Sequence, residues 1–146
     1  MTLRLRPEEP TDDAFLRALV MDTIAGELGA DHWPEPIRSQ LLGMQYNNRR
    51  SPRPDASSLV IEVDGQDAGW LLTRPTAECI SLVEIMVSRS LRGKGIGTAV
   101  IREVLAAGKP VRLHVNVTNI VAQRLYERLG FRCAEDTGVQ YLMEHP

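Results

Sequence analysis

The stretch Arg92-Gly93-Lys94-Gly95-Ile96-Gly97-Thr98 lies between a predicted strand, Ile80–Ser88, and a predicted helix, Gly95–Ala107. Glycines at alternate positions let a ligand approach the backbone closely. Successive N–H groups at a helix N-terminus attract phosphate through hydrogen bonds and the helix dipole. Arg92 and Lys94 add two positive charges. The stretch therefore predicts a site for a phosphorylated ligand; a plain flexible turn is the alternative, and it needs only one glycine.

Two common nucleotide-binding patterns do not fit this stretch. A Walker A loop requires G-x-x-x-x-G-K-[ST], whereas Lys94 stands between two glycines. A Rossmann fingerprint requires G-x-G-x-x-G, and Thr98 occupies the place of its last glycine. The acid that binds ribose is also missing, because the next strand, Val111–Val117, ends in Asn116 and Thr118. The sequence therefore argues against both types of site.

The pattern that does fit is R-x-x-G-x-G, at Arg92, Gly95 and Gly97. A second stretch, Asn119–Phe131, reads N-x-x-A-x-x-L-Y-x-x-x-G-F. Together the two patterns resemble the pyrophosphate loop and a later helix of the GNAT superfamily of acyl-CoA N-acyltransferases. The resemblance covers roughly Glu78–Met143, and the first half of the chain fits only in the order of its predicted elements.

Apolar alternation, glycine and proline boundaries and a tight turn predict the other elements. Strands are predicted at Leu3–Arg6, Leu59–Val63, Ala68–Thr73, Ile80–Ser88, Val111–Val117, Phe131–Glu135 and Val139–Met143. Helices are predicted to begin near Thr11 and Pro34 and to span Gly95–Ala107 and Ile120–Leu129. The resemblance implies an α/β (α+β) fold: a mostly antiparallel central sheet of six to seven strands, flanked by about four helices, with one splayed parallel pair that binds CoA.

Two features of the first half concern its surface. Ile37, Leu41 and Met44 recur at i, i+4 and i+7, the spacing of an apolar helix face. The stretch Asn47–Ala56 contains three arginines and two prolines, which predicts an exposed loop. This loop is the most basic segment of the chain, and solvated surface is favoured over a ligand-binding role.

Length and composition set the frame for these motifs. The chain has 146 residues, 43% of them hydrophobic, and a formal net charge of −2, which fits one domain spanning 1–146. The charge argues against general nucleic-acid binding. Two cysteines, Cys79 and Cys133, are too few for a disulfide scaffold and form no close metal-ligand pair, so we expect a reducing, cytoplasmic setting. No segment reaches the length of a membrane span, so we expect no membrane partner.

The resemblance implies that acetyl-CoA lies between the parallel strands Ile80–Ser88 and Val111–Val117, with no metal. Backbone groups at Met86 and Val87 would hold the pantetheine arm and polarise the acetyl carbonyl. The residues implied to contact the cofactor elsewhere are Arg92, Gly93, Lys94, Gly95, Ile96, Gly97 and Thr98 at the pyrophosphate, and Asn119, Ala122 and Tyr126 on the following helix.

The reaction implied is direct attack by an amine on the thioester, which needs a neutral amine, an oxyanion donor and an acid for the departing thiolate. Tyr126 is the candidate acid; the alternative is a core residue on an amphipathic helix. Glu84 and His114 are candidate bases, since each is a titratable residue inside an apolar strand. An outward-facing Glu84, a structural His114 and a water relay from both remain open.

The resemblance leaves the acceptor unnamed: a primary amine of a small molecule, a peptide N-terminus or a lysine fits equally, and a homodimer is possible. Two other functions would use the same fold. One is a non-catalytic acyl-CoA-binding regulatory domain, which binds CoA without turnover. The other is a protein-interaction module, which binds no CoA at all. Fold alone does not separate the three.

Overall fold

One seven-stranded sheet organises the computed structural model, which describes residues 1–146. Its strands are β1 (Leu3–Pro7), β2 (Ser57–Val63), β3 (Gln66–Pro75), β4 (Ile80–Val87), β5 (Val111–Asn116), β6 (Arg132–Asp136) and β7 (Gln140–His145). They lie in the order β1-β2-β3-β4-β5-β7-β6, and every neighbouring pair is antiparallel except β4 and β5. The predicted mixed sheet with one parallel pair is confirmed.

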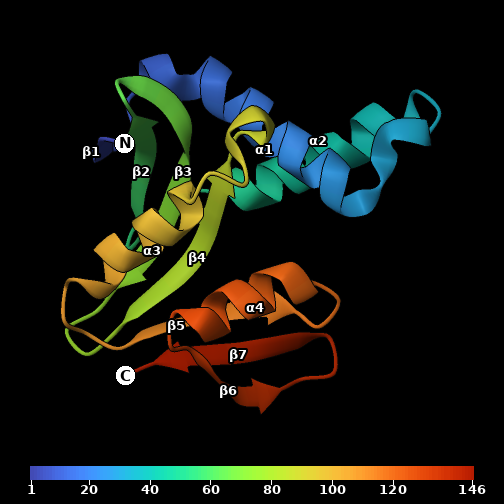
Figure 1. The fold of residues 1–146 in the computed structure, drawn as a ribbon. Coiled ribbons are helices and arrows are strands. Elements are labelled where there is room, and N and C mark those ends of the chain that lie inside the picture. The colour runs from blue at the N-terminus through green and yellow to red at the C-terminus, as the bar shows by residue number, and fades with distance from the viewer.

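Four helices cover the two faces of the sheet. They are α1 (Asp13–Leu28), α2 (Ile37–Arg50), α3 (Ile96–Leu105) and α4 (Ile120–Arg128), with short 3-10 turns η1 (Pro10–Asp12), η2 (Ala30–His32) and η3 (Arg89–Leu91). Helices α3 and α4 lie on one face, and α1 and α2 pack on the other (Figure 1). Each face has its own core, so burial of apolar side chains fixes both layers against the strands.

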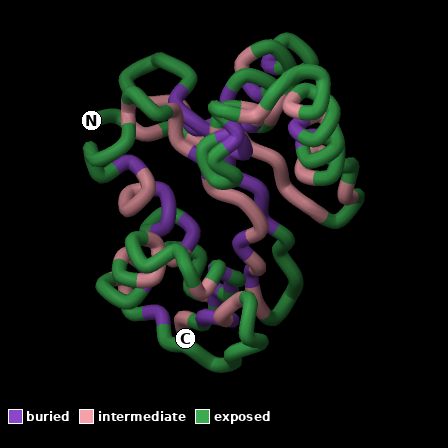
Figure 2. The backbone as a smooth tube through the Cα atoms, turned by 90° about the vertical axis from the view of Figure 1, so that its right-hand side faces the viewer, coloured by how far each residue is buried: buried purple, intermediate pink, exposed green.

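Helix α3 buries the apolar stripe that its sequence encodes. In α3, Ile96, Val100 and Val104 face the sheet, as the spacing of an amphipathic helix predicts. On the other face Trp70 of β3 is 1% exposed and packs in the core under α1 and α2. Figure 2 shows buried residues along the strands and exposed residues at the loops. The central strands are therefore held from both sides and form a firm support.

The parallel strands β4 and β5 separate partway along their length. Their pairing is limited to three positions, the last of which joins Leu82 to Leu113. On the other side of β4 the register shifts, so that Thr73 pairs with Leu82, and Leu72 pairs with Glu84. The extra residue is a β-bulge, and a bulge bends its strand and re-aims the side chains beyond it. The bulge therefore lies where the two strands part.

The structure departs from the sequence pattern around α2 in two ways. Ile37, Leu41 and Met44 are 52%, 41% and 64% exposed, and the helix instead buries Leu42. The predicted loop Asn47–Ala56 begins as the last turn of α2, and its three arginines are half-buried. Helix periodicity defines a face but not which face meets the sheet, and long arginine side chains lie along apolar surface while their charges find partners.

Gly69 lies where β3 comes closest to β4. A Cβ atom at this position would lie 2.1 Å from the backbone carbonyl oxygen of Met86. The register of β2 against β3 shifts beside it, between Ile61 and Glu62. Glycine inside a strand commonly marks a bulge or a close approach of another backbone, and both occur here. Gly69 thus sets the position of the open end of β4.

We expect Gly69→Ala to lower the free energy of unfolding by about 1–3 kcal/mol or more, because a backbone carbonyl cannot rotate away as a side chain can. Urea denaturation measures the loss. Gly43→Ala is the matched control: its added Cβ meets no atom within 4 Å in the interior of α2. That change should raise stability by up to about 1 kcal/mol. Equal stabilities for the two variants would contradict the assigned contact.

Candidate functional site

The glycine-rich loop joins β4 to α3 and presents backbone donors. Gly93 and Gly95 have φ values of +75° and +81°, a region that other residues rarely adopt. Gly95 is the N-cap of α3, and the first bond closing onto it runs from the Ala99 N–H to the Gly95 carbonyl at 3.0 Å. The amides before Ala99 therefore have no acceptor within the helix, which is the arrangement that binds anions.

A cavity of about 670 Å³ opens beside this loop. Its lining comprises Ile85, Val87, Leu91, Arg92, Gly93, Gly95, Ile96, Gly97, Thr98, Ile101, Asn119, Val121, Ala122, Leu125, Tyr126 and Arg128. A Cβ atom at Gly93, Gly95 or Gly97 would meet no atom within 4 Å, so the backbone borders open space. The structure thus brings the two sequence motifs, one before α3 and one in α4, to the same cavity.

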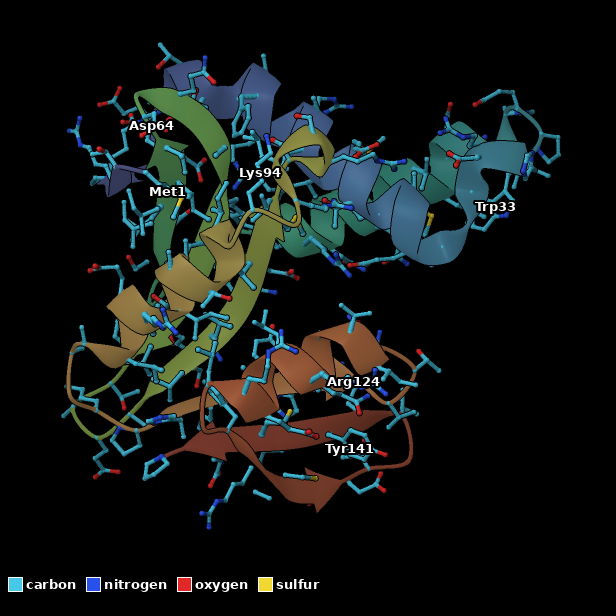
Figure 3. All side chains as sticks on the ribbon, viewed as in Figure 1. Met1, Trp33, Asp64, Lys94, Arg124 and Tyr141 are labelled. Carbon is cyan, nitrogen blue, oxygen red and sulfur yellow. The ribbon has the colours of Figure 1, made fainter.

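The loop residues contribute to this cavity unequally. Arg92 donates its Nε–H to the Val87 carbonyl at 3.0 Å, which ties the loop to the end of β4. The Met86 side chain is buried in the core under α1, and Met86 is not among the residues that line this cavity, whereas Val87 is. Lys94 is exposed and lies outside the cavity lining (Figure 3). The predicted cofactor contact of Lys94 therefore has no support from the lining.

Asn119 has a structural task at this cavity as well. Its side-chain oxygen accepts the Ala122 N–H at 3.2 Å and caps the start of α4. An N-cap supplies an acceptor that the first turn of a helix otherwise lacks. Both residues line the cavity, so the spacing N-x-x-A positions the N-terminus of α4 toward the opened strands.

A second cavity, of about 280 Å³, adjoins the first between β4 and β5. The two cavities have Ile85, Asn119, Ala122 and Tyr126 in common. The second is also lined by Glu27, Arg49, Leu82, Val83, Glu84, Leu113, His114, Val115, Asn116 and Gln140. All three predicted catalytic residues, Glu84, His114 and Tyr126, therefore lie around one space that continues into the glycine-rich loop.

Glu84 is a half-buried carboxyl in a charged cluster. Burial raises the pKa of Glu84, and the nearby charge of Glu27 raises it further, while Arg49 and Arg53 oppose the shift. Arg49 lies 3.4 Å from Glu84 through its Nε and pairs more closely with Glu27, at 2.6 Å. A carboxyl with a raised pKa is a better proton acceptor near neutral pH than an ordinary one.

Tyr126 faces the same space from α4 and is 8% exposed. Burial raises the pKa of its phenol, and the negative charge of Glu84 adds to the shift. The phenol therefore stays protonated and available as a proton donor. Its ring also packs against Phe131, with centroids 5.6 Å apart, so the residue combines a core contact with a place at the cavity.

His114 lies on β5 between two residues, Leu113 and Val115, that face the core. Its own side chain points to the other face, is exposed and lines the second cavity. The predicted placement on the strand is right, and the histidine reaches the same space as Glu84.

Sequence reasoning missed Arg49 and Glu27 as residues of the site. They come from α2 and α1, far from the motifs, and only tertiary packing brings them to Glu84. The density of arginines in Asn47–Ala56 was the available signal. The structure contains no group of three or more side chains that could hold a metal ion. None of its helices has the length and apolar character needed to cross a membrane.

Comparison with known proteins places this arrangement in a family. The sequence profile of the Acetyltransferase (GNAT) family matches residues 16–131. An uncharacterised N-acetyltransferase of Methanocaldococcus jannaschii is 32% identical over 79 residues, covering 50% of this chain and 51% of that protein. Mycothiol acetyltransferase of Nocardia farcinica is 36% identical over 83 residues, covering 56% of this chain and 27% of that protein. The chain thus matches about half or less of these relatives' length.

The fold agrees over a longer range than the sequence does. The crystal structure of PaiA N-acetyltransferase from Thermoplasma acidophilum in complex with coenzyme A has a TM-score of 0.76 to this chain, at 19% identity and 99% coverage of both chains. At that identity the likeness concerns the fold, including the parallel pair. Because the family profile also spans most of the sequence, the chain belongs to the acetyltransferase (GNAT) family.

Proposed function

We propose that this protein transfers an acetyl group from acetyl-CoA to a primary amine of a small molecule, peptide or protein. The observation that carries the proposal is that the two cavities adjoin each other and share four lining residues, Tyr126 among them. One end presents the backbone amides of the glycine-rich loop, and the other presents Glu84 and Tyr126. An anion site joined to a proton acceptor and a proton donor is what amine acetylation by a phosphorylated thioester requires.

The residues at the first cavity fit coenzyme A. The loop offers amides, the positive end of α3 and the Arg92 guanidinium to a pyrophosphate, and its three glycines leave the backbone open to close approach. The apolar side chains of Ile85 and Val87 line the path from the loop toward Glu84. The related fold of PaiA N-acetyltransferase holds coenzyme A, which supports the same ligand class.

Glu84 is the proposed base. Bound acetyl-CoA would supply the thioester carbonyl, whose carbon bonds to the amine nitrogen as the carbon–sulfur bond breaks. An amine arriving as ammonium must first lose a proton, and Glu84, directly or through water, would accept it. Its raised pKa allows that transfer near neutral pH, while the Arg49 guanidinium beside it keeps the ionised form accessible.

Tyr126 is the proposed acid. It stands at the junction of the two cavities, where a departing thiolate would form. Its phenol is protonated across the neutral range because burial and Glu84 raise its pKa. The two residues, which line the same cavity, thus have opposite roles in proton transfer: Glu84 accepts a proton and Tyr126 donates one. His114 is the alternative base, with its exposed position as the main argument against it.

We expect Gly97→Asp to weaken CoA binding at least about tenfold while leaving the fold intact. Gly97 lies in the first turn of α3 without positive φ, and an added side chain meets only open space. A carboxylate there suits the helix dipole but repels pyrophosphate. Gln40→Asp adds the same charge to the first turn of α2 and serves as control. Calorimetric titration with CoA measures both; unchanged affinity in Gly97→Asp would refute the loop assignment.

We expect Glu84→Gln to lower kcat by about a hundredfold or more, because the amide cannot accept a proton. In the wild-type enzyme kcat/KM should fall as pH drops through the raised pKa of Glu84, since the protonated carboxyl is inactive. The variant should lose this acidic limb. His114→Ala should retain it. A profile in which His114→Ala loses the limb and Glu84→Gln keeps it would assign the base to the histidine.

We expect Tyr126→Phe to lower kcat by about a hundredfold with unchanged CoA affinity, since the ring contact with Phe131 survives and only the donor is lost. Steady-state kinetics and CoA titration of the same preparation separate the two effects. An unchanged kcat would remove Tyr126 as the acid. CoA binding by the wild type without turnover on a broad amine panel would favour a regulatory binding domain instead.

A further inference from the structure

Three arginines line a third cavity, of about 260 Å³, beside the segment that connects α2 to β2. Its lining comprises Glu8, Arg49, Arg50, Ser51, Pro52, Arg53, Ala56, Ser58, Trp70 and Leu72. Glu8 is the single carboxylate among these residues, so the lining carries an excess of positive charge. Such a cavity favours an anion, because a concave site lined mainly by one sign of charge raises the local concentration of the opposite charge.

Two of the three arginines are engaged with carboxylates. Arg50 makes two hydrogen bonds to Glu8, at 2.6 and 2.9 Å, and its guanidinium lies 5.0 Å from the centre of the Trp70 ring. Arg49 pairs with Glu27 and approaches Glu84. These contacts hold Arg49 and Arg50 in place, and they account for the charges of both.

Arg53 differs from its two neighbours. It makes no ion pair within 4 Å, whereas Arg49 and Arg50 each make at least one. Its Nη1 atom, like the Nε atom of Arg50, is buried without a hydrogen-bond partner. A buried charged donor without an acceptor is costly and calls for a ligand or another explanation. The backbone on either side is stiffened by Pro52 and Pro54, and the Ala56 N–H closes a turn onto the Arg53 carbonyl at 3.0 Å. The guanidinium is therefore presented from a rigid segment.

The third cavity adjoins the proposed reaction centre. Leu72 lines it and is the register partner of Glu84 across the β3–β4 pair. Paired residues in an antiparallel ladder have Cα atoms about 4.5–5.5 Å apart. The guanidinium of Arg49 lines both this cavity and the one that contains Glu84. A group bound at Arg53 would thus lie a short distance from an amine at Glu84.

We propose that the third cavity binds an anionic group of the acceptor, so that the substrate is a primary amine that carries a carboxylate or phosphate a few bonds away. Arg53 contacts the anion directly, and Arg49 lies between the anion and the amine. This inference rests on the proposed function, since it specifies the acceptor of the same site. A guanidinium is suited to the task because its planar donors match two oxygens of a carboxylate or phosphate.

The test uses acceptor pairs that share a carbon skeleton, one member with an anionic group and one without, each compared at a pH where both amines are in the same protonation state. Acetyl transfer is measured with glycine, β-alanine and 4-aminobutyrate, each against its carboxamide, and with O-phosphoethanolamine against ethanolamine. We expect kcat/KM for at least one anionic member to exceed that of its neutral partner about tenfold or more. The pair with the largest ratio distinguishes carboxylate from phosphate and gives the spacing. Ratios near one for every pair would overturn the proposal.

Variants assign the preference to Arg53. In Arg53→Gln the ratio should fall toward one, through loss of activity with the anionic acceptor, and Arg53→Lys should recover part of it. Effects of the substitution that are common to both members of a pair cancel in the ratio, which therefore reports on the anion. Arg38→Gln removes an arginine of α2 that lies outside the third cavity and pairs with Glu35. It is the matched control and should keep the wild-type ratio. An unchanged ratio in Arg53→Gln would overturn the assignment.

A binding measurement separates this inference from the proposed function. With CoA in place of acetyl-CoA no transfer occurs, and the side-chain Nε–H signal of Arg53 is followed by NMR during titration with the anionic acceptors. A shift with the anionic member and none with its neutral partner supports the anion site, even if no amine is acetylated. Turnover of amines without discrimination and without a shift supports the acetyltransferase and overturns the anion site.

Discussion

The early end of the β4–β5 ladder is the constraint on which the site depends. Parallel strands normally satisfy each other's backbone groups along their length, and here the pairing stops at Leu82. The backbone carbonyls and amides of β4 and β5 beyond this point must find other hydrogen-bond partners. The pantetheine arm of CoA, which is extended and carries amide groups, is a suitable partner. The register shift at the same level of β4 redirects Glu84 toward the opening. These two irregularities lie at the same level of β4, one on each side of it, and Glu84 lies beside both.

Charge in this molecule acts locally. The net charge of −2 gives no indication of an anion-binding protein, yet two separate positive sites flank the half-buried carboxyl of Glu84. The first uses backbone amides and the end of α3, which leave the formal charge unchanged. The second uses arginine side chains anchored by Glu8 and Glu27. Salt screens such half-buried sites less than it screens the open surface, so composition is a poor guide to the ligand.

The sequence allowed the fold to be predicted where signals were local. Alternation and glycine boundaries located all seven strands to within a few residues, and the two motifs located the cavity walls at α3 and α4. The orientation of α2 could not be predicted in this way, because Ile37, Leu41 and Met44 form a regular stripe that the sheet does not cover. Arg49 and Arg53 could not be predicted as residues of the site for the same reason. Arg49 lies beside Glu84, and Arg53 lines a cavity with Leu72. The packing of α2 on β3 and β4 brings these residues together, and the periodicity of the sequence does not encode that packing.

The arginines also explain how a half-buried Glu84 can serve as a base. Burial alone raises the pKa of a carboxyl, and close pairing with a guanidinium lowers it. Arg49 is held mainly by Glu27, so it opposes the burial of Glu84 without forming the short pair that would cancel it. Arg53, which is not within ion-pair distance, also lowers the pKa of Glu84. An anion bound at Arg53 would offset that positive charge and raise the pKa of Glu84 further. In the proposed arrangement, a correct acceptor therefore strengthens the base that acts on its own amine, and a neutral amine does not.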